Sequence, residues 1–315
     1  MRWTKRGLIH ALTPGKDWRH SHTQLPIIHA TEEHWRIYHS SRNVEGRSLP
    51  VAIDIAPGDP STVIAEHSTP LLELGQPGAF DEHGVMPTAV LTMPDGLYLY
   101  YIGWSLQQDV PYRNAIGLAV STDGGETFER YRTEPLIARS SIDPEFTGTF
   151  NVLRQDGLLH GYYMSCTGWL EHDGRLEPCY HIRYAHSQDG IAWQRDGHVC
   201  IDFESEHEGG IVAASTLKID DRFHMWYCHR NDRDYRDNAH RNSYRIGYAS
   251  SDDAIHWQRE DESVGIDISE QGWDSEMICY PNVVRHADTL YMFYNGNGFG
   301  QSGIGVATCD TQTLL

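Results

Sequence analysis

The stretch Phe223-His224-Met225-Trp226-Tyr227 has four counterparts elsewhere in the 315-residue sequence, and this repetition decides the fold. Each counterpart is a short hydrophobic strand pattern that closes on a tyrosine. The five segments are His34–Tyr38, Leu97–Tyr101, Leu159–Tyr163, Phe223–Tyr227 and Leu290–Tyr294. The steps between the closing tyrosines are 63, 62, 64 and 67 residues, so five similar units fill the chain.

Two further patterns recur in the same order within the units. A second strand signal follows each of the last four tyrosines, at Ile116–Ala119, Ile182–Ala185, Ile246–Ala249 and Ile304–Ala307. Three of these signals continue into a turn that ends in an aromatic residue, at Ser121–Phe128, Ser187–Trp193 and Ser251–Trp257. Asp and Gly suit a tight turn, and we expect the aromatic residue to pack between neighbouring sheets. Several short strands in a unit of this length are typical of a β-propeller blade.

The sequence therefore predicts an all-β fold, a single five-bladed β-propeller domain over residues 1–315. The approximate blades are residues 15–75, 76–140, 141–203, 204–268, and 269–315 plus 1–9. The fifth unit stops soon after its third strand signal, and Trp3–Ile9 resembles Trp193–Val199. We expect the N-terminal strand to close the last blade, because a closed ring exposes no sheet edge.

Composition narrows the classes of partner. The formal net charge of −19 disfavours nucleic acid and anionic membranes, which the chain would repel over long range. No stretch approaches the ~18 apolar residues of a membrane span, and Met1–Arg6 has no apolar signal core, so we expect a cytoplasmic protein. The six cysteines show no CxxC spacing and no HxH or HExxH pairing is found near the strand starts, so we predict no metal and no cofactor. The oligomeric state stays open.

Carboxylates recur where the first strand of each blade should begin, at the mouth of the predicted central channel. Glu82, Glu145 and Glu276 lie five residues before equivalent points of their units, and Glu208 lies six residues before. Glycosyl transfer needs two carboxyl groups facing a sugar, one as acid and one as base or nucleophile. We predict Asp81 or Glu82 together with Glu276 as this pair, and Glu208 as the third candidate. The alternative for any single member is an ordinary acidic surface loop.

Other side chains near the predicted mouth suit sugar binding. Histidine and glutamine hydrogen-bond hydroxyl groups, tryptophan faces stack on sugar rings, and arginine binds carboxylate or phosphate. The alternative for each arginine is pairing with a neighbouring acidic residue. The predicted substrate-binding residues are His22, Gln24, Arg42, His83, Trp104, Glu145, Trp169, Arg230 and Asp274.

These segments carry a resemblance to a known group of proteins. With Glu82, Glu208 and Glu276, the chain resembles the five-bladed β-propeller glycosidases, glycoside hydrolase families 43, 32 and relatives. Ser21–Pro26, Phe80–Gly84 and Gly272–Pro281 look most like uncharacterised glycosidase-like propellers of bacterial surface-polysaccharide gene clusters. Those glycosidases typically carry a carboxylate on the first blade, where this chain has His22 and Gln24. If the chain is an enzyme, its acid and base must therefore come from other blades.

The resemblance implies a carbohydrate-active enzyme, glycoside hydrolase-like, that cleaves or transfers a glycosyl unit of a carbohydrate or glycoconjugate. One alternative is a glycosyltransferase or phosphorylase of surface-polysaccharide metabolism, in which arginine-rich loops bind the phosphate of a donor. The other alternative is a sugar-binding propeller without catalysis. Clustered carboxylates favour chemistry, whereas a binding module would place Trp, Asn and Gln at the mouth.

Overall fold

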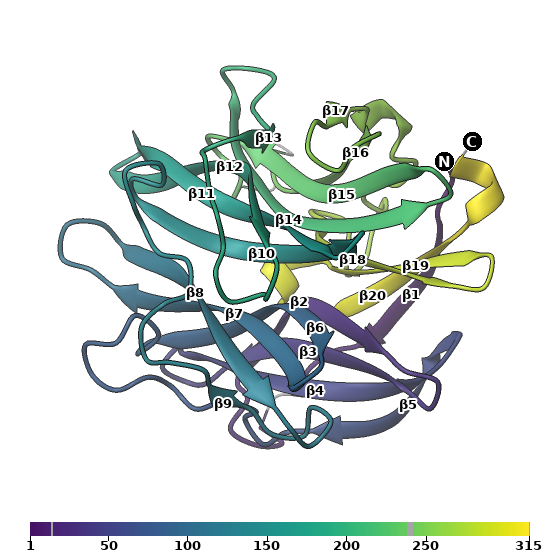
Figure 1. Cartoon of the computed structure of the whole chain (residues 1–315), viewed down its shortest axis with the longest axis horizontal. Helices are drawn as coiled ribbons and strands as arrows, with labels where there is room; N and C mark the ends of the chain where they lie inside the picture. Colours follow the sequence, from purple (N-terminus) through teal and green to yellow (C-terminus); the bar gives the residue numbers. More distant parts are fainter. Residues whose placement is uncertain (14, 238–241, 315) are drawn as a thin grey trace.

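The computed structural model describes residues 1–13, 15–237 and 242–314, and strands dominate it (Figure 1). Strands fall into five consecutive units that follow the sequence repeats. Unit 1 holds β2 (Ser21–Ala30), β3 (Trp35–Arg42), β4 (Ser48–Ala56) and β5 (Asp59–His67); unit 2 holds β6 (Gly84–Met93), β7 (Gly96–Leu106), β8 (Tyr112–Ser121) and β9 (Glu129–Arg130). Unit 3 holds β10 (Phe146–Gln155), β11 (Leu158–His172), β12 (Arg175–Ser187) and β13 (Val199–Ile201); unit 4 holds β14 (Glu208–Ile219), β15 (Arg222–Asn231), β16 (Arg245–Ser251) and β17 (Gln258–Arg259).

Unit 5 combines both ends of the chain. It holds β18 (Cys279–His286), β19 (Thr289–Asn295), β20 (Ile304–Asp310) and the N-terminal β1 (Thr4–His10). Short helical turns are η2 (Asp261–Ser263), α1 (Asn297–Gly300) and η3 (Thr311–Leu314). None of the helices within the described ranges has the length and apolar character needed to cross a membrane.

Strands that follow one another within a unit pair antiparallel, as hairpin connections allow. Single parallel pairs, Ser48 with Gly84 and Tyr180 with Gly210, join unit 1 to unit 2 and unit 3 to unit 4. Unit 5 forms a separate sheet in the order β1-β20-β19-β18.

The first strands of the units are neighbours in space. β2, β6, β10, β14 and β18 contact one another in this order, and β18 also contacts β2. Side chains bridge the neighbours: the Ala213 amide donates to Thr149 Oγ1 at 3.0 Å, and the Val283 amide donates to Ser215 Oγ at 2.8 Å. The amide of Ile28 donates to Asn282 Oδ1 at 3.1 Å, which links β2 to β18. The contacts therefore lead from β2 through every first strand and back to β2.

The N-terminal strand supplies an edge of the last sheet, as the sequence predicted. β1 pairs antiparallel with β20, with Thr4 opposite Thr308 and Leu8 opposite Gly305. The two chain ends consequently lie close together in Figure 1. Trp3 is buried, and its ring packs edge-on against Trp226 of unit 4 at 5.9 Å between ring centres. The N-terminal segment thus contacts both unit 5 and unit 4.

The closing tyrosines explain why glycine recurs in the second strand signal. Tyr101 faces Gly117 across the β7–β8 pair, and Tyr227 faces Gly247 across β15–β16. A Cβ atom on Gly117 would lie 2.3 Å from Tyr101 Cζ, so the tyrosine ring occupies the space of a side chain. Glycine is needed at these positions for close packing against the ring.

Four closing tyrosines also belong to a repeated Asp–Tyr–cation cluster. In each cluster the tyrosine hydroxyl donates to an aspartate, which also pairs with a basic residue from the outer edge of the same unit. The clusters are Asp81–Tyr101–Arg130, Asp143–Tyr163–Arg195, Asp261–Tyr227–Arg259 and Asp274–Tyr294–Lys5. Each cluster connects the loop that carries its aspartate to the second strand of the same unit.

The predicted turns are present and pack between units. Asp189 Oδ1 accepts the amides of Ile191 and Ala192 at 2.8 Å, and Asp123 and Asp253 make the equivalent bonds in their own turns. The aromatic residues that end the turns pack edge-on against a tyrosine of the preceding unit. The pairs are Phe128–Tyr38, Trp193–Tyr100 and Trp257–Tyr162, with ring centres 5.5–6.1 Å apart. The expected packing of these aromatics between sheets is confirmed.

Candidate functional site

A cavity of about 360 Å³ lies where the first strands of the five units meet. Every first strand contributes a side chain to its wall: His22, Gln24 and Leu25 from β2, Met86 from β6, Thr149 from β10, Val212 from β14 and Tyr280 from β18. Clefts where several elements converge are the usual place for a small-molecule site. The sequence predicted a ligand site at the start of these first strands, and the predicted residues His22 and Gln24 of β2 line the cavity.

Aromatic side chains form a large part of the remaining wall. They are Trp104 from β7, Tyr112 from β8, Tyr180 from β12, Tyr235 and Tyr244 from the connection between β15 and β16, and Phe299 from α1. Trp104 Nε1 donates to Ser48 Oγ at 2.7 Å, which fixes the indole orientation. Flat apolar faces with polar edges suit the faces and hydroxyl groups of a sugar.

The backbone around the cavity is strained. His22, Leu25, Tyr280 and Phe299 line the cavity and have φ values of 66°, 59°, 55° and 58°. Positive φ costs a residue with a Cβ atom about 1–3 kcal/mol and persists only where surrounding contacts hold it. At Leu25 the holding contact is its amide, which donates to Asn295 Oδ1 at 2.9 Å. Strain of this kind is typical of ligand sites.

Arg42 stands at the end of β3 and faces the cavity. Its Nη2 donates to Gln24 Oε1 at 3.1 Å, and Gln24 Nε2 donates to the Tyr280 hydroxyl at 3.4 Å. Burial lowers the pKa of Arg42 from its ordinary value, and the positive charge of Arg236 lowers it further. Burial and the Arg42 charge likewise lower the pKa of His22 to about 4, so this imidazole is neutral at pH 7.

Arg236 lines the cavity and forms an ion pair with a carboxylate. Its Nε donates to Glu177 Oε1 at 3.1 Å, and the Tyr235 hydroxyl donates to Glu177 Oε2. Burial alone would raise the pKa of Glu177, but the hydrogen bonds from Arg236 and Tyr235 outweigh it and lower the pKa. Glu177 therefore stays ionised and holds Arg236 and Tyr235 in place.

Arg230 lies behind the tyrosine wall rather than in it. Its guanidinium carbon is 3.7 Å from the centre of the Tyr235 ring and 4.9 Å from that of Tyr180. Its nitrogens donate to the Pro178 and Asn231 carbonyls and to the Tyr180 hydroxyl. Arg230, predicted to bind substrate, thus supports two tyrosines that line the cavity.

Two of the four predicted catalytic carboxylates are held in ion pairs. Asp81 is buried in its Asp–Tyr–cation cluster, where Oδ2 accepts Arg130 Nε at 2.9 Å. Glu208 accepts both terminal nitrogens of Arg259 at 2.8 Å and lies 3.2 Å from His229 Nδ1. Neither residue lines the cavity.

The other two carboxylates are freer. Glu82 Oε2 accepts the Gly78 amide at 2.8 Å, and Glu82 Oε1 lies 3.5 Å from His83 Nδ1. The half-buried Glu276 carboxylate has no hydrogen-bond or ion-pair partner among the residues that the structure describes. Neither lines the cavity, but Met277, beside Glu276, accepts the amide of the cavity residue Phe299 through its sulfur at 3.2 Å.

The predicted binding residues divide into two groups. His22, Gln24, Arg42 and Trp104 line one cavity. The others lie outside its wall: His83 packs on Trp104, Trp169 packs on Tyr112 and donates to Glu145, Asp274 pairs with Lys5, and Arg230 lies behind Tyr235.

Sequence reasoning missed several lining residues, namely Tyr112, Tyr180, Tyr235, Tyr244 and Tyr280. The available signal was tyrosine content, because the chain has 17 tyrosines and the repeat accounts for five of them. Those outside the repeat include Tyr280, four residues after Glu276, and Tyr235, in the polar stretch between β15 and β16.

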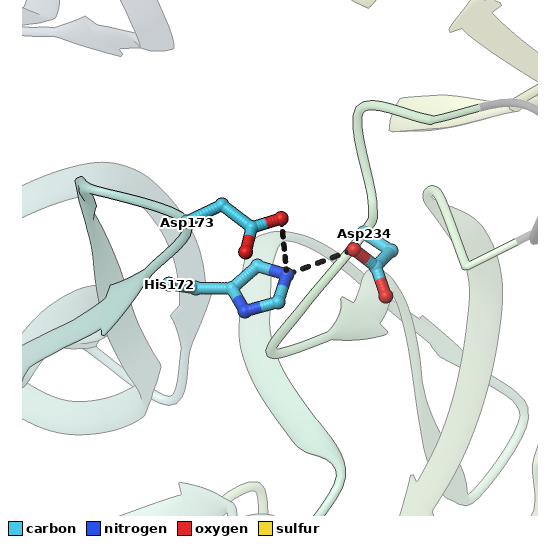
Figure 2. A group of neighbouring side chains, drawn as sticks. All are labelled: His172, Asp173 and Asp234. Atoms are coloured by element: carbon cyan, nitrogen blue, oxygen red, sulfur yellow. Dashed lines mark hydrogen bonds and ion pairs between the residues drawn. The ribbon is translucent and has the colours of Figure 1, made fainter.

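A second cluster of polar groups lies beside this wall. Figure 2 shows the His172 imidazole between the carboxylates of Asp173 and Asp234, with Nε2 2.8 Å from Asp234 Oδ1 and 3.7 Å from Asp173 Oδ2. These three groups lie close enough to hold a metal ion, and they already pair with one another. The hydrogen bond that His172 donates to the Asp234 carboxylate raises the pKa of His172. The cluster joins the β11–β12 hairpin of unit 3 to the segment of unit 4 that carries Tyr235 and Arg236.

Comparisons with known proteins place this geometry in context. No protein-family model matches the chain. Two proteins of Mycobacterium tuberculosis, uncharacterized protein MT1551 and uncharacterized protein Rv1502, are each 34% identical over 313 residues. The match covers 98% of this chain and 100% of each relative.

Solved structures share the fold at low sequence identity. A structure described as a glycoside hydrolase has a TM-score of 0.74 and 16% identity, and the match covers 96% of this protein and 90% of that one. A thermostable family-43 glycoside hydrolase has a TM-score of 0.64 and 14% identity, covering 94% and 91%. A protein of the GH130 family, which contains mannoside phosphorylases and glycoside hydrolases, has a TM-score of 0.68 and 14% identity, covering 98% and 94%. The predicted resemblance to glycosidase propellers is confirmed as a likeness of fold.

Proposed function

Because this chain belongs to the same family as the uncharacterized Mycobacterium tuberculosis proteins MT1551 and Rv1502 and shares its fold with glycoside hydrolases, we propose that it is a carbohydrate-active protein. In this proposal a glycosyl unit binds in the central cavity and is cleaved or transferred there. The observation that carries the proposal is the cavity itself, lined by Trp104, tyrosine rings and the amides of Gln24 and Asn114.

The proposal includes the complete architecture. We interpret the five units as five blades of one propeller over residues 1–315, closed by the N-terminal strand. Two findings support it: the first strands contact one another from β2 round to β18 and back, and β1 pairs with β20. A cavity on the axis of such a ring is bordered by all blades, which agrees with the origin of the lining residues.

Cleavage or transfer needs a carboxylic acid or carboxylate that is free to exchange a proton. Among the predicted carboxylates we favour Glu276, because its side chain is unpaired within the described part of the chain and its neighbour Met277 contacts Phe299. Glu82 is the proposed partner. Asp81 and Glu208 are bound by arginines, which suits a positioning role.

One observation favours sugar binding without catalysis as the second candidate. None of the described residues that line the cavity is an aspartate or glutamate. Glycosidases place two carboxyl groups against the scissile bond. The experiment must therefore measure binding and turnover on the same preparation.

We would test both candidates with a panel of aryl furanosides and pyranosides, with and without inorganic phosphate. Thermal stabilisation of the protein measures binding, and release of the aryl alcohol measures turnover. We expect the wild type to cleave at least one glycoside. Glu276→Gln should cleave the same glycoside about 10²–10⁴-fold more slowly. The exposed Glu262→Gln serves as the matched control and should keep full activity.

The two readouts separate the outcomes. Thermal stabilisation without release of the aryl alcohol would favour a sugar-binding protein over an enzyme. If no member of the panel stabilised the protein or was cleaved by it, the carbohydrate-active role would be contradicted. If Glu276→Gln released the aryl alcohol as fast as the wild type, Glu276 would not be the catalytic residue, but the enzymatic activity would stand.

A further inference from the structure

The surroundings of the cavity are positively charged, although the chain as a whole has a net charge of −19. Arg42 and Arg236 line the cavity, and Arg230 lies directly behind Tyr235 and Tyr180. The carboxylate that contacts this group is Glu177, which binds Arg236. Within the described part of the chain, these three guanidinium groups pair with one carboxylate, while Asp173 and Asp234 of the adjoining cluster pair with His172.

Over the described ranges, the half-buried Arg42 lacks an acidic partner, unlike the buried Arg19 and Arg36, and it also lacks the two backbone carbonyls that accept from the buried Arg230. Arg19 pairs with Asp17 and Glu66, and Arg36 pairs with Asp54 and Glu126, at 2.6–2.8 Å. Arg42 has no carboxylate partner among the described residues, and its Nε is buried without a hydrogen bond. A buried charge without a counter-ion is costly, so proteins pair such charges or bind a ligand that pairs them.

We propose that the ligand of the central cavity carries an oxyanion, a carboxylate or a phosphate group, which binds Arg42. This inference rests on the proposed function and narrows it to acidic or phosphorylated glycosyl ligands or to phosphate itself as a co-substrate. Carboxylate and phosphate both match the planar fork of a guanidinium group, and charge-assisted bonds of this kind are strong.

The neighbours of Arg42 favour an anion over a neutral or cationic group. Arg236 adds a second positive charge, and its field already lowers the pKa of Arg42. The hydroxyl of Tyr280 and the amide of Gln24 are hydrogen-bonding groups beside the guanidinium. Because the whole chain repels anions over long range, affinity for an anion must come from this local group of charges.

We would measure dissociation constants for matched probes by calorimetry on the full-length protein. The probes are glucose, glucuronate, galactose, galacturonate, glucose 1-phosphate and inorganic phosphate, all at one ionic strength. The variants are Arg42→Gln, Arg42→Lys and the control Arg47→Gln, whose exposed side chain pairs with Glu45 in the following turn. Thermal unfolding checks that each variant is folded.

We expect at least one anionic probe to bind about tenfold or more tightly than its neutral counterpart. Arg42→Gln should remove this advantage, Arg42→Lys should keep part of it, and Arg47→Gln should keep all of it. Tight binding of glucuronate or galacturonate identifies an acidic sugar, and tight binding of phosphate alone identifies a co-substrate. Tight binding of glucose 1-phosphate alone identifies a phosphorylated sugar.

The opposite results would overturn the inference. Neutral sugars that bind as tightly as the anions would contradict it and leave the proposed function standing. Anionic binding that survives in Arg42→Gln would assign the anion to another part of the protein. If Arg42→Gln does not fold, the comparison of Arg42→Lys with Arg47→Gln decides, because lysine keeps the charge and loses the fork. Failure of every probe to bind would contradict both proposals.

Discussion

Replacement of Asp81 by asparagine would separate a structural carboxylate from a catalytic one. Asp81 is only 1% exposed, and its Oδ2 accepts Arg130 Nη2 at 2.8 Å and the Tyr101 hydroxyl at 3.1 Å. Asparagine keeps the shape of the side chain but removes its charge. Arg130 would then keep its positive charge in a largely buried position without a counter-ion.

The magnitude follows from the burial of the pair. Removing one member of a buried ion pair costs about 3–5 kcal/mol. Because the Arg130 side chain is 20% exposed and water can reach it, we expect the low end, about 3 kcal/mol. At about 2 °C per kcal/mol for a chain of this size, Asp81→Asn should lower the Tm by about 6 °C.

The assay is thermal and urea unfolding, followed by product release at 25 °C with the best aryl glycoside. The double variant Asp81→Asn/Arg130→Gln should cost less than the sum of the two single variants, since the pair is lost only once. Glu276→Gln is the comparison and should melt with the wild type. If Asp81→Asn melts with the wild type and has lost turnover, the structural assignment is wrong and Asp81 acts in catalysis.

Two further predictions concern stability. Deletion of residues 1–9 should destabilise the whole protein by at least about 3–5 kcal/mol, because it removes β1 and the buried Trp3, and an unchanged Tm would contradict this. Burial alone would raise the pKa of Glu208, but hydrogen bonds from His229 and Arg259 lower it to about 2. Its stabilising effect is thus present above the ordinary glutamate pKa and lost as the pH falls toward 2. Glu208→Gln should be less stable than the wild type at pH 7 in urea unfolding and equal to it near pH 2, and a constant difference between the two pH values would exclude this linkage.

The repeating parts of the chain were predictable because equivalent residues make the same packing contacts in each unit. Tyr101 needs a glycine opposite, and its neighbour Tyr100 packs against the turn aromatic Trp193 of the next unit, so residues of these types recur at fixed positions. The same argument predicted that the N-terminal segment pairs with the last unit, and β1 does pair with β20.

The site was harder to predict because its residues do not recur. Asp81, Asp143 and Asp274 repeat for a structural reason, since each binds the tyrosine 20 residues later. Their basic partners are remote in sequence, Arg130 being 49 residues from Asp81 and Lys5 269 residues from Asp274. The sequence therefore predicted Asp81 as a catalytic residue and Asp274 as a binding residue, although both positions repeat for this structural reason.

The cavity residues show the opposite behaviour. Arg42, Arg236 and Tyr280 have no equivalents in the other units and meet only when five first strands converge. Positive φ at His22 and Tyr280 has no signature in the residue type. A ligand without fivefold symmetry requires such differences among similar units, so departures from the repeat were the better guide to the site.

The pairing of β1 with β20 also sets the order of events during synthesis. Thr4 pairs with Thr308, so β1 has no native partner until β20 has been made. At about 5–20 residues per second, ribosomes need about 15–60 s for the roughly 300 residues between them. During that interval the N-terminal strand has no native partner, and unpaired strand edges invite association with other chains. The strand β1 thus leaves the ribosome long before its partner and is among the last to reach its native place.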